Sequence, residues 1–155
     1  MLDTEYMHLA LEQAHTALVQ GEVPIGALLV KDKQVIATGY NQPISSHDPS
    51  AHAEIVCLRQ AGKFLNNYRL NDCTLYVTIE PCAMCVGAMI HARISKVVFG
   101  TLAVKTGAII SQQKMLDQQY FNHTLEYTHG ILELKCAKIM QDFFRHKRNT
   151  ANDCL

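Results

Sequence analysis

The sequence predicts a single α/β domain in which helices cover a mixed β-sheet. Three observations lead to this class. Short runs of β-branched and aromatic residues alternate with segments of helical periodicity, which is the pattern of α/β folds. Residues 75–99 have the order strand, helix, strand, which favours parallel pairing through a right-handed crossover. The 155 residues contain no repeat and no linker, so one core must serve the whole chain.

The elements of the first half are predicted from the spacing of apolar residues and from the residues that end each run. A helical segment stops at a glycine, two strand-like runs are separated by a three-residue turn, and a loop with two prolines precedes a second helix. The expected elements are a helix with Asp3 as N-cap that ends at Gly21, a hairpin of strands 25–30 and 34–39, the loop 40–50, and a helix 52–60 that Gly62 ends.

The second half is predicted in the same way. A proline is well placed at the first position of a helix, where its missing N–H costs nothing. The last segment carries its apolar residues on one side, as an amphipathic helix does. The expected elements are strand 75–79, a helix with Pro81 at its first position that runs to about His91, strand 96–99, an edge strand 125–128, and a final helix 132–148.

Composition restricts the class of protein before any motif is considered. Apolar residues make up 48% of the chain and charged residues 18%, which allows a substantial core and excludes intrinsic disorder. Because no long apolar run is present and Asp3 and Glu5 lie near the start, we expect no membrane span, no secretory signal and a cytoplasmic location. The six cysteines are then expected as reduced thiols or metal ligands.

Charge is balanced over the whole chain but not along it. Residues 1–134 contain nine basic and twelve acidic side chains, a net charge of −3, whereas residues 135–155 contain five and two, a net charge of +3. The basic end can be a solvated helix whose cations suit the negative end of the helix dipole. It can also be the electrostatic footprint of a nucleic-acid partner, which needs independent support.

A metal site is predicted from two short motifs. His52 begins His-Ala-Glu, and Cys82 and Cys85 belong to Pro-Cys-Ala-Met-Cys. Each motif opens a predicted helix, where unpaired N–H groups and the positive end of the dipole favour thiolates. Two thiolates and one imidazole suit Zn²⁺, and three protein ligands leave one tetrahedral position open, as in catalytic zinc sites.

Glu54 is expected to carry protons rather than to bind the metal. Residues two apart in a helix point about 200° from each other, so His52 and Glu54 are poorly placed to ligate one ion together. In the first turn of a helix both side chains can still border one cavity. Zinc can lower the pKa of water from about 15.7 to about 7, and a neighbouring carboxylate can then take the proton.

Two other interpretations of the cysteines remain open from the residues alone. Cys82 and Cys85 could form a redox pair, or a fourth ligand could close a structural zinc site, for which Cys73 is the better placed candidate. Glu80, directly before the cysteine motif, is interpreted as structural. The remaining cysteines are interpreted as small residues without an assigned function: Cys57, Cys136 and Cys154.

The whole chain resembles the tRNA-specific adenosine deaminases of the cytidine/deoxycytidylate deaminase superfamily. His-x-Glu together with Pro-Cys-x-x-Cys is the signature of zinc deaminases in general. The His-Asp-Pro loop at 47–49, Lys-Thr-Gly-Ala at 105–108 and Phe-Phe-Arg at 143–145 narrow the resemblance to the tRNA enzymes. It implies a three-layer α/β/α, cytidine-deaminase-like fold with a mixed five-stranded sheet, in which residues 1–155 form one zinc-dependent deaminase domain.

The resemblance also implies a reaction, the hydrolytic deamination of adenosine to inosine at the wobble position of an arginine tRNA anticodon. His52, Cys82 and Cys85 would hold one Zn²⁺ per subunit, and zinc-bound hydroxide would attack C6 of the adenine. Glu54 would deprotonate the water, protonate adenine N1 and later protonate the departing amine. A free-base deaminase, acting on guanine or cytosine, is the nearest enzymatic alternative, and a non-catalytic zinc-binding module is the alternative from another class.

Further residues match the substrate-binding positions of the family. The resemblance implies that Asn41 and the backbone N–H of Ala53 hydrogen-bond the flipped-out adenine, and that Val23 and Ile25 form apolar walls. Splayed loop bases stacked on an aromatic ring and held by arginine are the expected mode of RNA binding. The residues that match positions facing the anticodon loop are Arg69, Lys105, Asn122, His123, Phe144 and Arg145.

The family also forms homodimers, with the helix 81–91 near the interface and Gly87 and Ala88 allowing close approach. One position departs from the family pattern. Many relatives carry an acidic residue shortly before Lys-x-Gly, where it meets a ribose 2′-hydroxyl, and this sequence has Ala103 there. Because the 2′-hydroxyl distinguishes RNA from DNA, we expect weaker discrimination against single-stranded DNA than in an acid-bearing relative.

Overall fold

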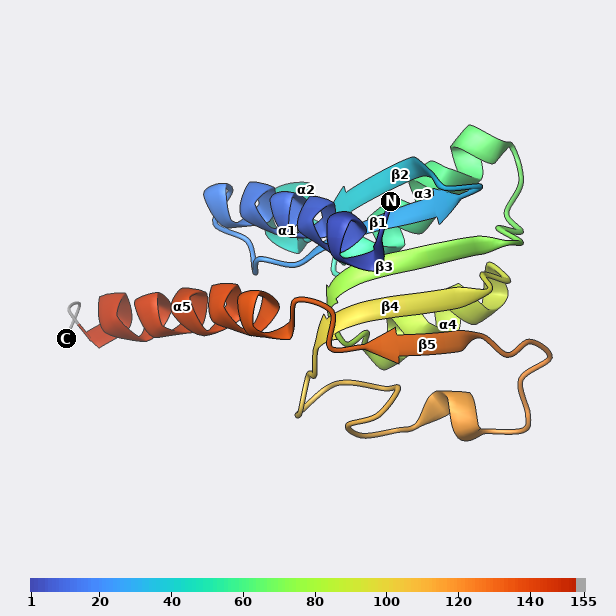
Figure 1. The fold of residues 1–155 in the computed structure, drawn as a ribbon. Coiled ribbons are helices and arrows are strands. Elements are labelled where there is room, and N and C mark those ends of the chain that lie inside the picture. The colour runs from blue at the N-terminus through green and yellow to red at the C-terminus, as the bar shows by residue number, and fades with distance from the viewer. Residues whose placement is uncertain (153–155) are drawn as a thin grey trace.

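The protein consists of one five-stranded sheet with helices on both faces (Figure 1). The structure is a computed structural model that describes residues 1–152. Cys154 lies outside the described residues. In chain order the elements are α1 (Asp3–Val19), β1 (Gly26–Lys31), β2 (Gln34–Tyr40), α2 (Pro43–Ser46), α3 (Ala53–Leu65), β3 (Cys73–Ile79), α4 (Ala83–His91), β4 (Lys96–Thr101), the 3₁₀ helix η1 (Met115–Asp117), β5 (Glu126–His129) and α5 (Glu133–Asn152).

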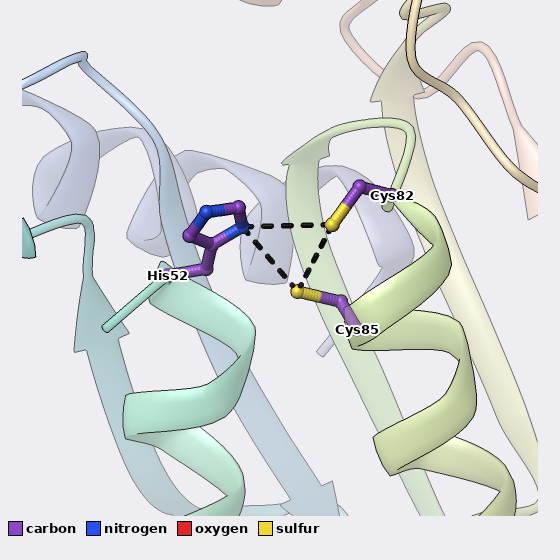
Figure 2. Close-up of side chains that lie close together, drawn as sticks. All are labelled: His52, Cys82 and Cys85. Atoms are coloured by element: carbon purple, nitrogen blue, oxygen red, sulfur yellow. Dashed lines mark hydrogen bonds between the residues drawn. The ribbon is translucent and has the colours of Figure 1, made fainter. Parts of the chain in front are cut away.

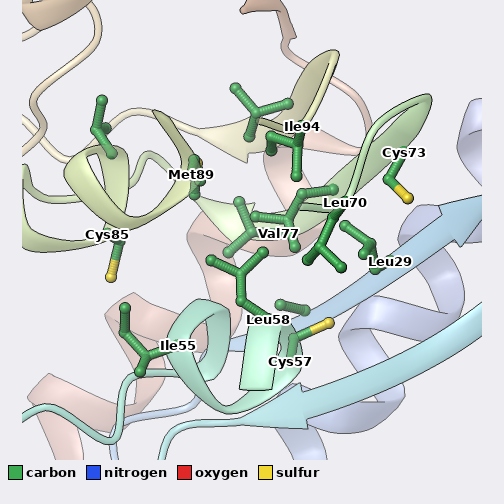
Figure 3. Close-up of a cluster of buried hydrophobic side chains, with 14 of the residues drawn as sticks. Leu29, Ile55, Cys57, Leu58, Leu70, Cys73, Val77, Cys85, Met89 and Ile94 are labelled. Atoms are coloured by element: carbon green, nitrogen blue, oxygen red, sulfur yellow. The ribbon is translucent and has the colours of Figure 1, made fainter. Parts of the chain in front are cut away.

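The central strands β1, β3 and β4 are buried on both faces of the sheet, and their side chains alternate between two cores. In β3, Leu75 and Val77 pack with α3 and α4, whereas Tyr76 between them packs with α1 and α5. This alternation follows from the two-residue period of a strand. Figure 3 shows the α3 and α4 side of the core, with Leu58 and Met89 packed over the strands. The three-layer α/β/α fold predicted from the sequence is therefore confirmed.

The strand order is β2-β1-β3-β4-β5. β1 pairs antiparallel with β2 and with β3, while β3 pairs parallel with β4 and β4 with β5. The predicted hairpin, the parallel crossover and the edge strand are confirmed. As a result the C-terminal ends of β2, β3 and β4 lie on the same side of the sheet, and we call this row of strand ends the functional edge. The opposite edge is the row of strand ends where β3 and β4 begin. It is about 20 Å away, which is the length of the seven residues of β3.

A glycine allows α3 to approach β2 closely at the functional edge. A Cβ atom on Gly39 would lie 2.3 Å from the carbonyl oxygen of Ala53 and 2.8 Å from the backbone nitrogen of Cys57. No side chain larger than hydrogen fits there without moving the helix. The first turn of α3 is thereby fixed against the strand, and with it the residues that begin the helix.

Several predicted element ends are wrong by a few residues. α1 has Leu2 rather than Asp3 as its N-cap, and the Asp3 carboxylate instead accepts a hydrogen bond of 2.6 Å from the Tyr76 hydroxyl. α3 continues through Gly62 to Leu65 and ends at Asn66, which adopts the left-handed conformation with φ of 50°. Asparagine tolerates this conformation better than most residues, so it can end a helix as glycine does.

Two further differences concern proline. Pro81 precedes α4 instead of occupying its first position, because Cys82 is the N-cap. Pro43 begins the short helix α2 inside the segment expected to be an irregular loop. α5 also extends further than predicted, to Asn152. Among the described residues, no helix combines the length and the apolar composition that a membrane crossing requires.

Candidate active site

His52, Cys82 and Cys85 lie together at the functional edge (Figure 2). Nδ1 of His52 is 3.6 Å from the sulfur of Cys82 and 3.6 Å from the sulfur of Cys85, and the two sulfurs are 3.7 Å apart. The imidazole extends from the start of α3 and both thiols from the start of α4, so the three side chains point toward one another across the gap between the helices. The structure therefore brings together the three residues that the sequence predicts as ligands.

The same local conformation places two of these residues. His52 and Cys82 are the N-cap residues of α3 and α4, both with extended backbones, and Cys85 is the third residue of α4. The expected angle of about 200° between the side chains of His52 and Glu54 requires both residues to belong to one helix. This expectation is wrong, because His52 precedes α3. The converging helix starts direct two positive dipole ends toward the sulfurs, which favours thiolates.

The spacing of the three donor atoms fits a tetrahedral zinc ion. Bond lengths of about 2.3 Å to sulfur and about 2.0 Å to nitrogen, at tetrahedral angles, separate two sulfurs by about 3.8 Å and sulfur from nitrogen by about 3.5 Å. The observed distances of 3.7, 3.6 and 3.6 Å agree with these values to within about 0.1 Å. The donor set also matches the preference of zinc for thiolate and imidazole, and it leaves a fourth position for another ligand.

The protonation of the two thiols differs because they share a hydrogen bond. This bond from Cys85 is the main reason that the pKa of the Cys82 thiol falls to about 4, and the contact with His52 lowers it further. The pKa of Cys85, the donor, is raised by the same bond and by burial. The hydrogen bond to Cys82 likewise raises the pKa of His52. A thiolate is thus favoured on Cys82, the more accessible of the two sulfur atoms.

Glu54 is a buried carboxyl group beside this cluster. Its side chain is only 3% exposed, and it follows His52 by two residues in the first turn of α3. Burial raises its pKa to about 7, while a hydrogen bond from the backbone and the charge of His52 act in the opposite direction. A carboxyl group with this pKa can both accept and donate a proton near neutral pH, which is the requirement for general acid–base chemistry.

Asn41 contributes a buried polar atom that lacks a partner. Among the buried side-chain nitrogen and oxygen atoms of residues 1–152, its Oδ1 is the one that makes no hydrogen bond. The backbone N–H of Asn41 donates to the carbonyl of Ile25, and the neighbouring N–H of Gln42 donates to the carbonyl of Ala51, next to His52. An unpaired buried amide oxygen is costly, so it indicates a ligand that supplies a donor at this place.

The other predicted pocket residues lie along the same segments. Ala53 is fully buried as the first residue of α3, where its N–H has no partner within the helix. Val23 and Ile25 are half-buried just before β1, and Ile25 packs against the core. The structure thus groups the predicted substrate residues around the start of α3. Their contacts with a substrate stay predictions.

Two buried glutamates at this edge were not assigned to the site from the sequence. Glu22 is 1% exposed and accepts hydrogen bonds from the backbone N–H groups of Ile44 and Ser45, which anchors α2. Glu80 is 2% exposed and binds a second loop in the same way. Acidic residues within otherwise apolar or turn-forming segments are the sequence signal for such groups, because a buried carboxylate needs several donors.

The alternative fourth ligand, Cys73, lies away from the cluster. It begins β3 at the edge opposite Cys82, and its thiol donates to the carbonyl of Asn71 at 3.5 Å. Within the described residues, the group that could hold a metal ion comprises His52, Cys82 and Cys85. Cys57 and Cys136 are buried, consistent with their interpretation as small core residues.

The six predicted RNA contacts fall into two groups. Lys105 is exposed on the loop beside Glu80, and Phe144 and Arg145 are exposed on the half of α5 that extends beyond the functional edge (Figure 1). The other three lie at the opposite edge, where they border a pocket of about 290 Å³ with aromatic and basic walls. Since about 20 Å separates the edges, these residues cannot all touch one nucleotide. The opposite-edge group consists of Arg69, Asn122 and His123.

Comparisons with known proteins found a matching family model and similar sequences. The model of the MafB19-like deaminase family matches residues 1–148. The tRNA-specific adenosine deaminase of Haemophilus influenzae is 48% identical over 147 residues, which cover 94% of this chain and 85% of the relative.

Two solved structures are also similar. One comes from a study of A-to-I editing by tRNA:A34 deaminases at the wobble position of transfer RNA, with a TM-score of 0.86 and 40% identity over 88% of this chain and 99% of the other. The guanine deaminase of Bacillus subtilis has a TM-score of 0.65 and 32% identity, over 96% of this chain and 95% of the other.

The cluster makes a testable prediction about metal content. Purified protein should contain about one zinc ion per chain, and Cys82→Ser should lose it on dialysis against a chelator, because zinc binds thiolate far better than a hydroxyl. Cys73→Ser is the matched control and should keep its zinc. Metal analysis of both variants measures this. Retention of full zinc by Cys82→Ser would contradict the assignment of the ligands.

Proposed function

This chain belongs to the family of tRNA-specific adenosine deaminases, and on that basis we propose that it converts the wobble adenosine of an arginine tRNA anticodon to inosine. The observation that carries the proposal is the buried carboxyl group of Glu54 beside the cluster of His52, Cys82 and Cys85. The thiol ligands require a reducing compartment, which supports a cytoplasmic location for the reaction.

The protein's own residues would perform three tasks. His52, Cys82 and Cys85 would hold one zinc ion, which when bound lowers the pKa of water and so supplies a nucleophile at neutral pH. Asn41 and the N–H of Ala53 would hydrogen-bond the edge of the flipped-out adenine, and they would orient C6 toward the attacking oxygen. Pairing would also satisfy the buried Oδ1 of Asn41.

Glu54 would move every proton in the reaction. It would take one from the attacking water as the C6–O bond forms, and it would give a proton to adenine N1, which makes C6 more electrophilic. It would then take the second proton from the C6 hydroxyl and give it to the amine, so that the C6 carbonyl forms, the C6–N6 bond breaks and ammonia leaves. Val23 and Ile25 would form the apolar walls of the pocket, which limit access of bulk water to these transfers.

For the RNA, we propose a division of roles that follows the two edges of the sheet. Lys105, Phe144 and Arg145 would contact the nucleotides next to the target base, by stacking and by charge. Arg69, Asn122 and His123 would bind a more distant part of the anticodon stem-loop, since about 20 Å separates them from the functional edge. A stem-loop is large enough to span this distance.

We also propose that the chain forms a homodimer through α3 and α4. A groove of about 900 Å³ runs between these helices and is bordered by exposed apolar side chains such as Met84 and Tyr68, which are 40% and 71% exposed. On α4, a Cβ atom at Gly87 would point into open space. A second copy would bury this apolar surface, whose position agrees with that expected from the family.

The role of Glu54 as proton carrier can be tested by substitution. Glu54→Gln should lower kcat on an arginine tRNA anticodon stem-loop by about two to four orders of magnitude, because the amide cannot accept the proton from water. Zinc content should stay the same. Inosine at the wobble position is measured by sequencing, with the exposed Glu126→Gln as control. Ammonia release from guanine or cytosine, without inosine in the RNA, would favour a free-base deaminase instead.

The second prediction concerns Ala103 and the choice of RNA over DNA. Ala103→Asp should raise the ratio of RNA to single-stranded DNA turnover by about tenfold, because the new carboxylate accepts a hydrogen bond from the 2′-hydroxyl. Val104→Asp introduces the same charge at the adjacent exposed residue and should slow both substrates equally. Equal ratios for wild type and Ala103→Asp would contradict the expected contact.

The third prediction concerns the dimer. Ala88→Arg should halve the molar mass in solution, because a buried cation without a partner prevents the two α4 helices from approaching. Leu134→Arg on α5, where the side chain is 85% exposed, is the matched control and should leave the mass unchanged. Light scattering coupled to size exclusion gives both masses. A monomeric wild type at micromolar concentration would rule out the dimer.

A further inference from the structure

Glu80 is a buried acidic residue whose carboxylate accepts hydrogen bonds from a single loop. It lies between β3 and the cysteine motif, and its side chain is 2% exposed. All the hydrogen bonds that its carboxylate accepts come from residues 103–111, which we call the 103–111 loop. Oε2 accepts from the N–H of Ala103 at 3.0 Å and from the Ser111 hydroxyl. Oε1 accepts from the N–H groups of residues 109, 110 and 111 at 3.2, 2.7 and 2.9 Å.

The loop is also wrapped closely around this carboxylate. A Cβ atom on Gly107 would lie 2.2 Å from the Glu80 carboxyl carbon, so the loop backbone packs directly on the acid. The N–H of Gly107 donates to the carbonyl of Ala103 at 2.7 Å, and the N–H of Ala108 donates to the carbonyl of Pro81 at 2.9 Å. The loop is thereby attached to the residue that precedes Cys82.

The charge of Glu80 is stabilised by hydrogen bonds from the 103–111 loop, four from backbone N–H groups and one from the Ser111 hydroxyl. Among residues 1–152, no lysine, arginine or histidine forms an ion pair with it. Between the two anchored ends of the loop, Val104 and Lys105 are exposed to solvent. The carboxylate therefore holds both ends of the segment that carries Lys105.

We propose that Glu80 is a positioning residue that fixes the 103–111 loop, and through it Lys105, for binding the phosphate backbone of the RNA substrate. The part that concerns RNA rests on the proposed function, whereas the part that concerns the loop does not. All five groups that contact the carboxylate are donors, so both of its oxygens must be acceptors. The structure thus requires an anion at this position, and a side chain of the same size is not sufficient.

Glutamine tests this requirement because it keeps the shape of glutamate and replaces one acceptor by a donor. Three backbone N–H groups face the Oε1 position, so the amide oxygen of Glu80→Gln remains there. The NH₂ group then faces the N–H of Ala103, while the Ser111 hydroxyl can rotate to accept from it. The variant should release the Ala103 end of the loop and retain the end at residues 109–111.

Hydrogen exchange of the RNA-free protein, followed by mass spectrometry, measures this release. In Glu80→Gln, amides at 103–107 should exchange about tenfold faster, and those at 109–111 should change much less. Glu22→Gln is the matched control, because Glu22 is another buried carboxylate that anchors a different segment. That variant should increase exchange around Ile44 and leave 103–107 unchanged.

Kinetics on the stem-loop RNA measures the consequence for binding. Glu80→Gln should raise KM by about tenfold and keep kcat within about twofold, with one zinc ion per chain retained. Gly107→Ala gives an independent test that leaves Glu80 intact, because the added methyl group collides with the carboxylate and displaces the loop. It should reproduce the rise in exchange at 103–107 and the rise in KM, and it decides the question if Glu80→Gln fails to fold.

Two results would overturn the proposal. One is an exchange rate of amides 103–107 in folded Glu80→Gln and Gly107→Ala that equals the rate in the wild type. The other is loss of zinc from Glu80→Gln together with normal loop exchange, which would assign Glu80 to holding Cys82. If the wild type fails to deaminate RNA, the proposed function fails, while the exchange experiment still decides whether Glu80 fixes the loop.

Discussion

The meeting of two helix starts at one point is the constraint on which the rest of the structure depends. His52 and Cys82 can face each other across 3.6 Å only if α3 and α4 begin at the same edge of the sheet. α4 begins there because it follows β3 directly. α3 begins there because the β1–β2 hairpin returns the chain to this edge and Gly39 lets the helix pack against β2. The strand order and this single glycine therefore determine the geometry of the cluster.

This use of helix starts lowers the stability of the helices. N-cap positions favour Ser, Thr, Asp or Asn, whose side chains bind the free N–H groups, and replacing such a residue costs about 0.5–2 kcal/mol. In α3 and α4 these positions are occupied by His52 and Cys82, and neither makes a side-chain cap. The uncapped N–H groups at the starts of α3 and α4 therefore stay free to favour a negative charge nearby, such as a thiolate. The sequence thus gives up local helix stability at the two places where His52 and Cys82 meet.

Most of the architecture could be predicted from the sequence because it depends on local patterns. The hairpin, the parallel crossover and the cysteine-bearing helix each have a signal within a few residues. The end of α3 could not be predicted, because Gly62 is compatible with a helix and the stop depends on the backbone conformation of Asn66. The separation of Arg69 from Lys105 was also inaccessible, since matching positions to a family gives residue roles without giving the distances between them.

The buried acids change the meaning of the zero net charge. Residues 1–152 contain fourteen basic and thirteen acidic side chains, and three of the acids, Glu22, Glu54 and Glu80, are buried. Within these residues no lysine or arginine is among the buried side chains. The surface of this part of the chain therefore carries fourteen basic side chains against ten acidic ones. Glu22 and Glu80 hold α2 and the 103–111 loop at the functional edge, and Glu54 lies beside the cluster of His52, Cys82 and Cys85, so these three charges are withheld from the surface. A chain that is neutral by composition can in this way present a basic surface to a polyanion such as RNA.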